Sequence, residues 1–279
     1  MIIMTISPIE NSMQYGAFLF LISLLIISVA AIKGYFKLQN TPSFSIPFYT
    51  IPIGFLLYFA AFILIGPFIV KNIGHTFSEI EKIGALIFLS LSAALILIYG
   101  FFKMNPILFA KIWKPNIKAT LLQSLKTALT TLLIAIPVIT FISWGIDLLI
   151  KNIWHISKIP EQLIINYLML AKTSPLQLFT IIFSIVVLAP FVEEFLFRGL
   201  IHNYIKKKGG KKTAILVTSL LFGFFHYSSS QGIGNYVIIA MIVILGFFLS
   251  LIYEKTGSLI TSILFHMFFN LLSTLLIFL

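Results

Sequence analysis

The chain has few charged residues and no cysteine at all. Only 10% of its 279 residues are Asp, Glu, Lys or Arg, whereas about 25% is usual for a soluble domain. Hydrophobic residues make up 59% and the mean hydropathy is +1.08, so too few polar side chains remain to cover a soluble surface. The lack of cysteine excludes disulfides and any cysteine-ligated metal site. The composition therefore predicts an integral membrane protein.

Acidic residues are especially scarce, with 8 Asp and Glu against 19 Lys and Arg and a net charge of +11. A basic balance of this size raises the question of nucleic-acid binding. Here, however, the lysines are scattered between apolar runs, as is usual when positive charge collects in the cytoplasmic loops of membrane proteins. We therefore expect no nucleic-acid partner.

Apolar runs long enough to cross a bilayer, about 17–25 residues, recur along the whole chain. They cover residues 15–32, 51–70, 83–102, 128–150, 176–205, 213–229, 236–253 and 258–279. If the N-terminus lies outside, most of the basic residues fall in inside loops, as the positive-inside rule requires. We predict an all-α, polytopic bundle of about eight transmembrane helices in the cell membrane. Losing one of the first four spans would break the alternation of inside and outside loops.

The runs divide the chain into N-terminal spans, residues 1–127, and a core, residues 128–279. Two connections are longer than a turn requires. Residues 103–126 intersperse lysines with apolar side chains and predict an interfacial amphipathic segment. In the second, Pro160-Glu161 predicts the start of a short helix on the outer face.

Three groups of polar residues interrupt the last four apolar runs. An ionisable side chain at the centre of a membrane helix costs roughly 2.5 kcal/mol or more, so it is a functional-site hypothesis by default. The groups are Glu193 and Glu194 with Arg198, Phe222 with His226, and His266 with Asn270. A rise of about 1.5 Å per residue from the nearest lysine places all three at a depth of roughly 16–21 Å. We therefore predict one shared site between three helices.

The two adjacent carboxylates are expected to differ in role. Glu194 and Arg198 stand four positions apart, so they share a helix face and can form an ion pair. Glu193 is turned about 100° away and has no partner on its own helix. Pro190 removes a backbone donor one turn earlier and can kink the helix.

Several chemistries fit these groups. A buried carboxylate can act as general base for water, with a histidine to hold the water or move its proton. A second histidine with an asparagine can donate hydrogen bonds to an oxyanion. Two His and one Glu can also bind zinc, although the usual His-Glu-x-x-His pattern is absent. A serine triad is disfavoured because no buried Asp accompanies the serines that follow His226.

In their order along the chain, the motifs resemble those of the CPBP (Abi) intramembrane proteases, a family that includes the type II CAAX prenyl proteases. The motifs are Glu193-Glu194-x-x-x-Arg198, Phe222-x-x-x-His226 and His266-x-x-x-Asn270. The resemblance covers about residues 176–274 and identifies the core as protease-like. It implies an intramembrane endopeptidase that acts on a membrane-associated or lipidated substrate in contact with membrane lipid.

The resemblance also implies roles for individual residues. Its catalytic set is Glu193, Glu194, His226, His266 and Asn270, supported by Arg198 and Phe222. Glu193 with His226 would activate water, and His266 with Asn270 would stabilise the oxyanion. Members of the family have been described both as metalloproteases and as metal-independent glutamate proteases. A zinc ion held by Glu193, His226 and His266 therefore stays an alternative.

Two functions of another class fit the composition. A proton-coupled transporter could use Glu193 and Glu194 as a relay, but the inverted repeat of many transporters is not visible. A membrane scaffold without catalytic activity could also keep the motifs.

Overall fold

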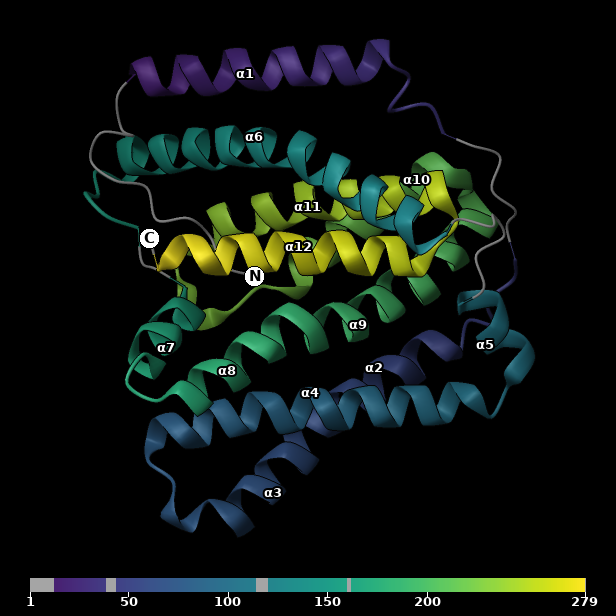
Figure 1. Ribbon diagram of the computed structural model, residues 1–279, viewed down its shortest axis with the longest axis vertical. Coiled ribbons are helices and arrows are strands. Elements are labelled where there is room, and N and C mark those ends of the chain that lie inside the picture. The colour runs from purple at the N-terminus through teal and green to yellow at the C-terminus, as the bar shows by residue number, and fades with distance from the viewer. Residues whose placement is uncertain (1–12, 39–43, 114–119, 160–161, 279) are drawn as a thin grey trace.

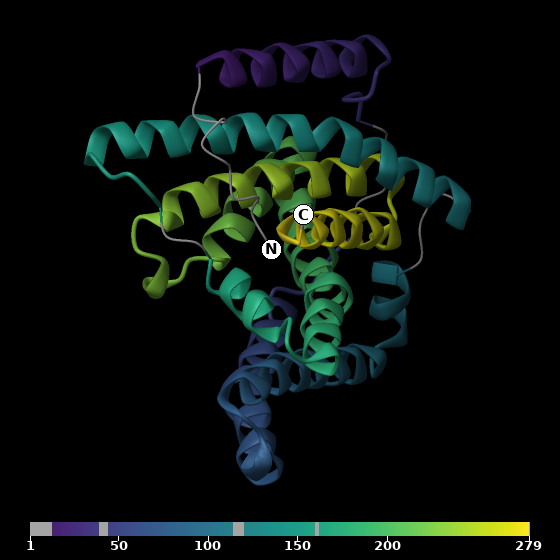
Figure 2. The same ribbon diagram turned by 60° about the vertical axis from the view of Figure 1, so that its left-hand side comes forward.

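The computed structural model describes residues 13–38, 44–113, 120–159 and 162–278. In these ranges every regular element is a helix and no β-strand occurs, so the predicted all-α class is confirmed. The helices form one layered bundle, with α1 and α6 on one side and α2, α3 and α4 on the other (Figures 1 and 2).

The first half of the bundle comes from the N-terminal part of the chain. Its elements are α1 (Met13–Ile32), α2 (Thr50–Ala60), η2 (Ala61–Ile65), α3 (Gly66–Ile73), η3 (Gly74–Thr76), α4 (Glu79–Lys103) and α5 (Pro106–Trp113). The helix α1 lies at the edge and packs against α6, as both ribbon views show. The helices α2, η2 and α3 follow one another directly and pack along α4.

The second half contains the polar motifs. Its elements are α6 (Leu121–Trp154), α7 (Leu163–Ala171), α8 (Pro175–Phe183), η4 (Ser184–Leu188), α9 (Ala189–Glu194), η5 (Phe195–His202), α10 (Asn203–Phe225), η6 (Ser229–Gln231), α11 (Gly234–Thr256) and α12 (Leu259–Ile277). The segments η4 and η5 are π-helical. The helix α11 is the most buried span, and it packs against α6, α10 and α12.

Seven helical segments in the described ranges are long and apolar enough to cross a membrane. The fifth, Pro175–Phe225, has 51 residues. Gly210, with φ 79° and ψ 175°, breaks its helical geometry. A straight helix would hold Glu193 and His226 roughly 50 Å apart, yet their side-chain atoms are 3.8 Å apart. The chain therefore reverses near Gly210, so this segment is long enough for two of the predicted spans.

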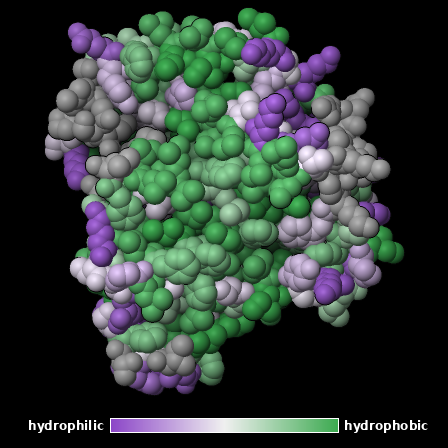
Figure 3. All heavy atoms as spheres, viewed as in Figure 1, coloured by the Kyte–Doolittle hydropathy of each residue, from purple (hydrophilic) through white to green (hydrophobic). Residues whose placement is uncertain are grey.

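The polar residues gather at the two ends of the bundle. Figure 3 shows a broad apolar face with the hydrophilic side chains along its margins. At one end, Lys255 Nζ donates to the Tyr35 carbonyl oxygen at 2.7 Å, and the Phe48 and Tyr204 rings lie 5.6 Å apart. Connections that the charge bias assigned to the inside are thus neighbours at the same end, as that assignment requires.

Both long connections contain the helices expected of them. In the first, α5 buries Leu108 and Ile112 and leaves Lys111 exposed, which is an amphipathic arrangement. Residues 114–119 of that connection lie outside the described residues. In the second, α7 confirms a short helix, while Pro160 and Glu161 also lie outside the described residues.

Candidate active site

The two motif carboxylates end α9, between the π-helical segments η4 and η5. Pro190 stands in the first turn of α9 and has no N–H to donate. Just before it the backbone pairs across five residues, with Ala189 N–H donating to the Ser184 carbonyl oxygen. The helix irregularity that the sequence predicted near Pro190 therefore takes the form of the π-helical segment η4. Such segments are frequent at functional sites.

The carboxylate of Glu193 faces two imidazoles from different helices. Its Oε2 lies 3.8 Å from His226 Nε2 and 3.8 Å from His266 Nε2. These distances are too long for direct hydrogen bonds and suit a bridging water. The Glu193 and His226 side chains are 13% and 18% exposed, so the bundle does not seal them off. The predicted meeting of three helices at one level is confirmed.

Glu194 lies behind this group and is fully buried. Its Oε1 accepts hydrogen bonds from Arg198 Nη1 at 2.9 Å and from His266 Nδ1 at 3.0 Å. The predicted Glu194–Arg198 ion pair is confirmed, and the contact with His266 is an addition that the sequence did not indicate. Arg198 also donates through Nη2 to the Gly246 carbonyl oxygen at 3.1 Å. The arginine thus ties η5 to α11.

The hydrogen bonds of the histidines fix which ring nitrogen faces Glu193. His226 Nδ1 lies 2.8 Å from the Phe222 carbonyl oxygen. A carbonyl oxygen only accepts, so this Nδ1 carries hydrogen. The same holds for His266 Nδ1 on Glu194, whose carboxylate is paired with arginine. Both rings therefore present Nε2 to Glu193, as an acceptor when neutral and as a donor when protonated.

Phe222 holds these polar groups in place by packing. Its buried ring centre lies 4.5 Å from the Arg198 guanidinium, 4.9 Å from the His226 ring and 5.8 Å from the His266 ring. The supporting position predicted for Phe222 agrees with these contacts. An arginine over an aromatic face is also attracted to the ring electrons.

The end of the sixth span differs from the prediction. Residues 213–229 were expected to be one apolar span, but α10 ends at Phe225 and His226 leaves the helix with φ −92° and ψ 7°. Serine, which favours caps and turns over helix interiors, occupies positions 228, 229 and 230. His226 is therefore at the helix end, where its ring can turn back to its own last turn.

Asn270 stands apart from the pair that the motif suggested. Its Nδ2 donates to the Ile185 carbonyl oxygen of η4 at 2.9 Å, and its buried Oδ1 has no partner among the described residues. Ile185 belongs to the π segment, where the regular helical pairing is interrupted. The structure thus brings together Glu193, Glu194, His226 and His266, while Asn270 braces the neighbouring turn.

A metal ion needs ligands that converge on one point. Glu193, His226 and His266 have the donor types that zinc prefers. However, no group of three or more His, Cys, Asp or Glu side chains in the described ranges is placed to hold a metal ion. As they lie, these residues give the zinc alternative no support, and zinc binding stays an untested prediction.

A second buried polar cluster lies one turn further along, at residues that the sequence did not single out. His202 Nε2 and Lys206 Nζ each lie 2.9 Å from Glu254 Oε1. Asn203 Nδ2 donates to the Arg198 carbonyl oxygen and to the Tyr253 hydroxyl, both at 2.8 Å. Glu254 ends an apolar run beside a lysine, so it looks like a solvated boundary charge. The one sequence feature that could have drawn attention to Glu254 is the scarcity of acidic residues in this chain.

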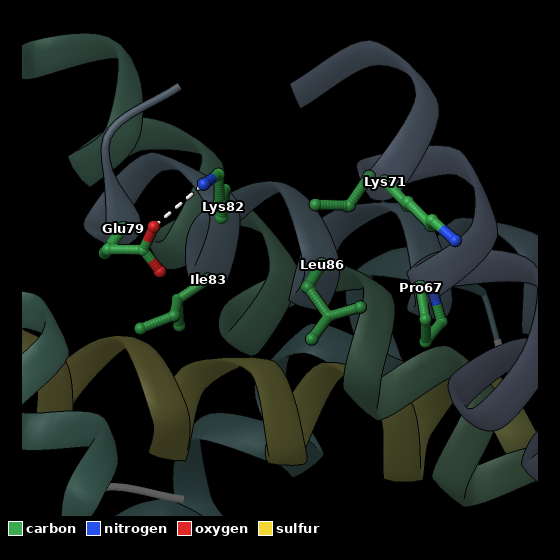
Figure 4. A pocket seen from close by; sticks show the side chains of 7 residues that line it. Pro67, Lys71, Glu79, Lys82, Ile83 and Leu86 are labelled. Carbon is green, nitrogen blue, oxygen red and sulfur yellow. Dashed lines mark hydrogen bonds and ion pairs between the residues drawn. The ribbon is translucent and has the colours of Figure 1, made fainter. Parts of the chain in front are cut away.

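The cavity in Figure 4 is separate from this site. It has a volume of about 300 Å³ and lies between α3 and α4. Its lining residues are Pro67, Val70, Lys71, Glu79, Lys82, Ile83 and Leu86. Glu79 and Lys82 form an ion pair of 2.8 Å there. None of the motif residues lines this cavity, so it is not the place where they would act.

A carboxylate and two imidazoles thus meet between the helices of a multi-pass membrane protein. Residues 175–272, which run from α8 into α12, match the family described as Type II CAAX prenyl endopeptidase Rce1-like. This match over residues 175–272 confirms the resemblance to CAAX-type membrane proteases that the motifs predicted. No curated protein and no solved structure matched the chain.

Proposed function

We propose that this protein is an intramembrane endopeptidase in which Glu193 activates water for attack on a peptide bond. The observation that supports the proposal is the convergence of two histidine Nε2 atoms on Glu193 Oε2, each at 3.8 Å. A water molecule between these three atoms meets a base and is held in one orientation.

In the first step the water oxygen bonds to the carbonyl carbon of the scissile peptide. Its proton passes to Glu193, and the carbonyl π electrons move to the oxygen, which becomes an oxyanion. His226 accepts the second water hydrogen at Nε2 because its Nδ1 donates to the Phe222 carbonyl. This contact points the water's lone pair at the carbon.

In the second step the tetrahedral intermediate collapses. The proton on Glu193 is delivered to the peptide nitrogen, the carbon–nitrogen bond breaks, and a carboxylic acid and an amine result. Until that bond breaks, the oxyanion of the intermediate accepts a hydrogen bond from His266 Nε2, with the ring carrying hydrogen on both nitrogens. Asn270 stays the second oxyanion donor implied by the family motif, through the amide hydrogen that Ile185 does not use.

Glu194 and Arg198 act through His266. The Glu194 carboxylate accepts a hydrogen bond from Nδ1 of that ring, an arrangement that also orients many metal-bound histidines. Arg198, one helical turn further along, holds the Glu194 carboxylate. The pair fixes the orientation of the imidazole and balances its charge.

The substrate we propose is a peptide or protein held at the cell membrane, with its scissile bond at the depth of Glu193. The family description names a CAAX prenyl endopeptidase. A prenylated C-terminal segment is therefore one candidate, and a membrane peptide without a prenyl group is another.

The experiment is cleavage of fluorogenic membrane peptides, prenylated and unprenylated, by the purified protein in lipid nanodiscs. Wild type should cleave at least one of them, and Glu193→Gln should lose at least about 100-fold in kcat. Glu79→Gln removes an exposed carboxylate on α4 and should cleave like wild type. Full activity of Glu193→Gln would refute the proposal. Loss of wild-type activity after chelation, with recovery on adding zinc, would favour the metal alternative.

A further inference from the structure

A residue outside the family-matched segment lies beside the proposed water site. The helix α2 packs against η5, where Gly54 approaches Leu196 so closely that a Cβ would come within 2.8 Å. One residue on, the Phe55 ring lies 5.7 Å from the Phe197 ring. The next turn of α2 carries Tyr58.

Two observations place Tyr58 at the level of Glu193. Its ring centre is 5.5 Å from the Phe225 ring, which is itself 6.0 Å from the His226 ring. Tyr58 also interacts electrostatically with the Glu193 carboxylate. The tyrosine therefore borders the site from α2, a helix that carries none of the three motifs.

The Tyr58 hydroxyl differs from the hydroxyls of the buried tyrosines. Tyr35 shares a hydrogen bond of 2.6 Å with Thr131, and Tyr253 accepts one of 2.8 Å from Asn203. For Tyr58, by contrast, the described part of the chain supplies no hydrogen-bond partner. The Tyr58 side chain is only partly buried, so this hydroxyl is available to a bound ligand.

The proposed reaction would also gain from a further hydrogen-bond donor. His266 supplies one donor to the oxyanion, and the Asn270 amide has only one hydrogen left for it, because the other is engaged with the Ile185 carbonyl. Oxyanion sites gain most from donors that are in position before the charge develops. A tyrosine hydroxyl on a packed helix meets that requirement and stays protonated at neutral pH.

We infer that Tyr58 is a further catalytic residue, whose hydroxyl donates a hydrogen bond to the substrate carbonyl oxygen as it becomes an oxyanion. This inference rests on the proposed function. No proton leaves the tyrosine, and only the strength of its hydrogen bond changes as the oxygen becomes charged.

The test compares Tyr58→Phe with wild type in the nanodisc cleavage assay. The change keeps the aromatic packing and removes one oxygen atom. We expect kcat to fall about 100-fold, the loss typical of removing one oxyanion donor, with KM changed less than about threefold, as for an interaction made only in the transition state. Tyr99→Phe, at a half-exposed tyrosine on α4, is the matched control and should behave like wild type.

A second readout separates an oxyanion contact from simple packing. A phosphinate analogue of the substrate carries a tetrahedral, charged centre, so Tyr58→Phe should weaken its binding far more than binding of the substrate peptide itself. An unchanged kcat, or a loss confined to KM, would overturn the assignment. Glu193→Gln in the same assay keeps the two ideas distinct, because its full activity would reject the proposed function whatever Tyr58→Phe does.

Discussion

Removing the guanidinium of Arg198 should destabilise the fold by several kcal/mol. Arg198 and Glu194 are both 0% exposed, so Arg198→Met leaves a carboxylate buried without its cation. Breaking one side of a buried ion pair costs about 3–5 kcal/mol. The Gly246 carbonyl oxygen loses the same donor, which acts in the same direction. At about 2–4 °C per kcal/mol for a large domain, the unfolding temperature should fall by roughly 10 °C.

The assay is thermal unfolding of the purified protein in detergent, followed by tryptophan fluorescence. Glu194→Gln alone should also destabilise, because it leaves the arginine buried without a counter-charge. The double variant, Glu194→Gln with Arg198→Met, should recover at least about 2 kcal/mol relative to the sum of the single changes. As a control, Lys82→Met breaks the exposed pair with Glu79 and should cost less than about 1 kcal/mol. Wild-type stability of Arg198→Met would refute this account of the pair.

Three further outcomes follow from contacts elsewhere in the bundle. A Cβ at Gly16 would collide with the Trp144 ring, so Gly16→Leu should release α1 from α6, seen as faster proteolysis of α1. Glu254→Leu removes a carboxylate that pairs with the buried Lys206 ammonium and should cost about 3–5 kcal/mol of unfolding free energy, measured in denaturant. Burial raises the pKa of Tyr35 from 10.0 to about 12. Its stabilising effect is therefore complete below about pH 10 and lost as the pH rises through 12, and Tyr35→Phe should reduce that alkaline loss of unfolding temperature.

Much of the fold could be predicted because charge is so rare in this chain. Apolar runs bounded by lysines gave the spans, and the structure moves most of their ends by only a few residues. The fifth and sixth runs emerged as one long segment, yet the lysines and glycines between them mark the reversal at Gly210. The same rarity made Glu193, His226 and His266 conspicuous. Their similar depth indicated the meeting that the structure shows.

Other parts of the site depend on packing that a linear pattern does not encode. The four-residue spacing revealed the partner of Glu194 on its own helix but not His266, which comes from α12. Glu254 meets His202 across two helices, and nothing local distinguishes it from a boundary charge. Tyr58 lies outside the motif-bearing part of the chain, and a tyrosine in an apolar run is ordinarily an interfacial anchor. The hydrogen bond from Asn270 to the Ile185 carbonyl oxygen depends on the π segment η4, which the sequence did not specify.

The central claim is that Glu193, His226 and His266 together hold the reacting water. A high-resolution crystal structure of the wild-type protein, with anomalous data collected at the zinc edge, tests it most directly. We predict a water peak within hydrogen-bond distance of Glu193 Oε2 and of both Nε2 atoms, with no anomalous signal. A zinc peak bound by these three side chains would contradict the claim, and so would a Glu193 carboxylate turned away from both histidines.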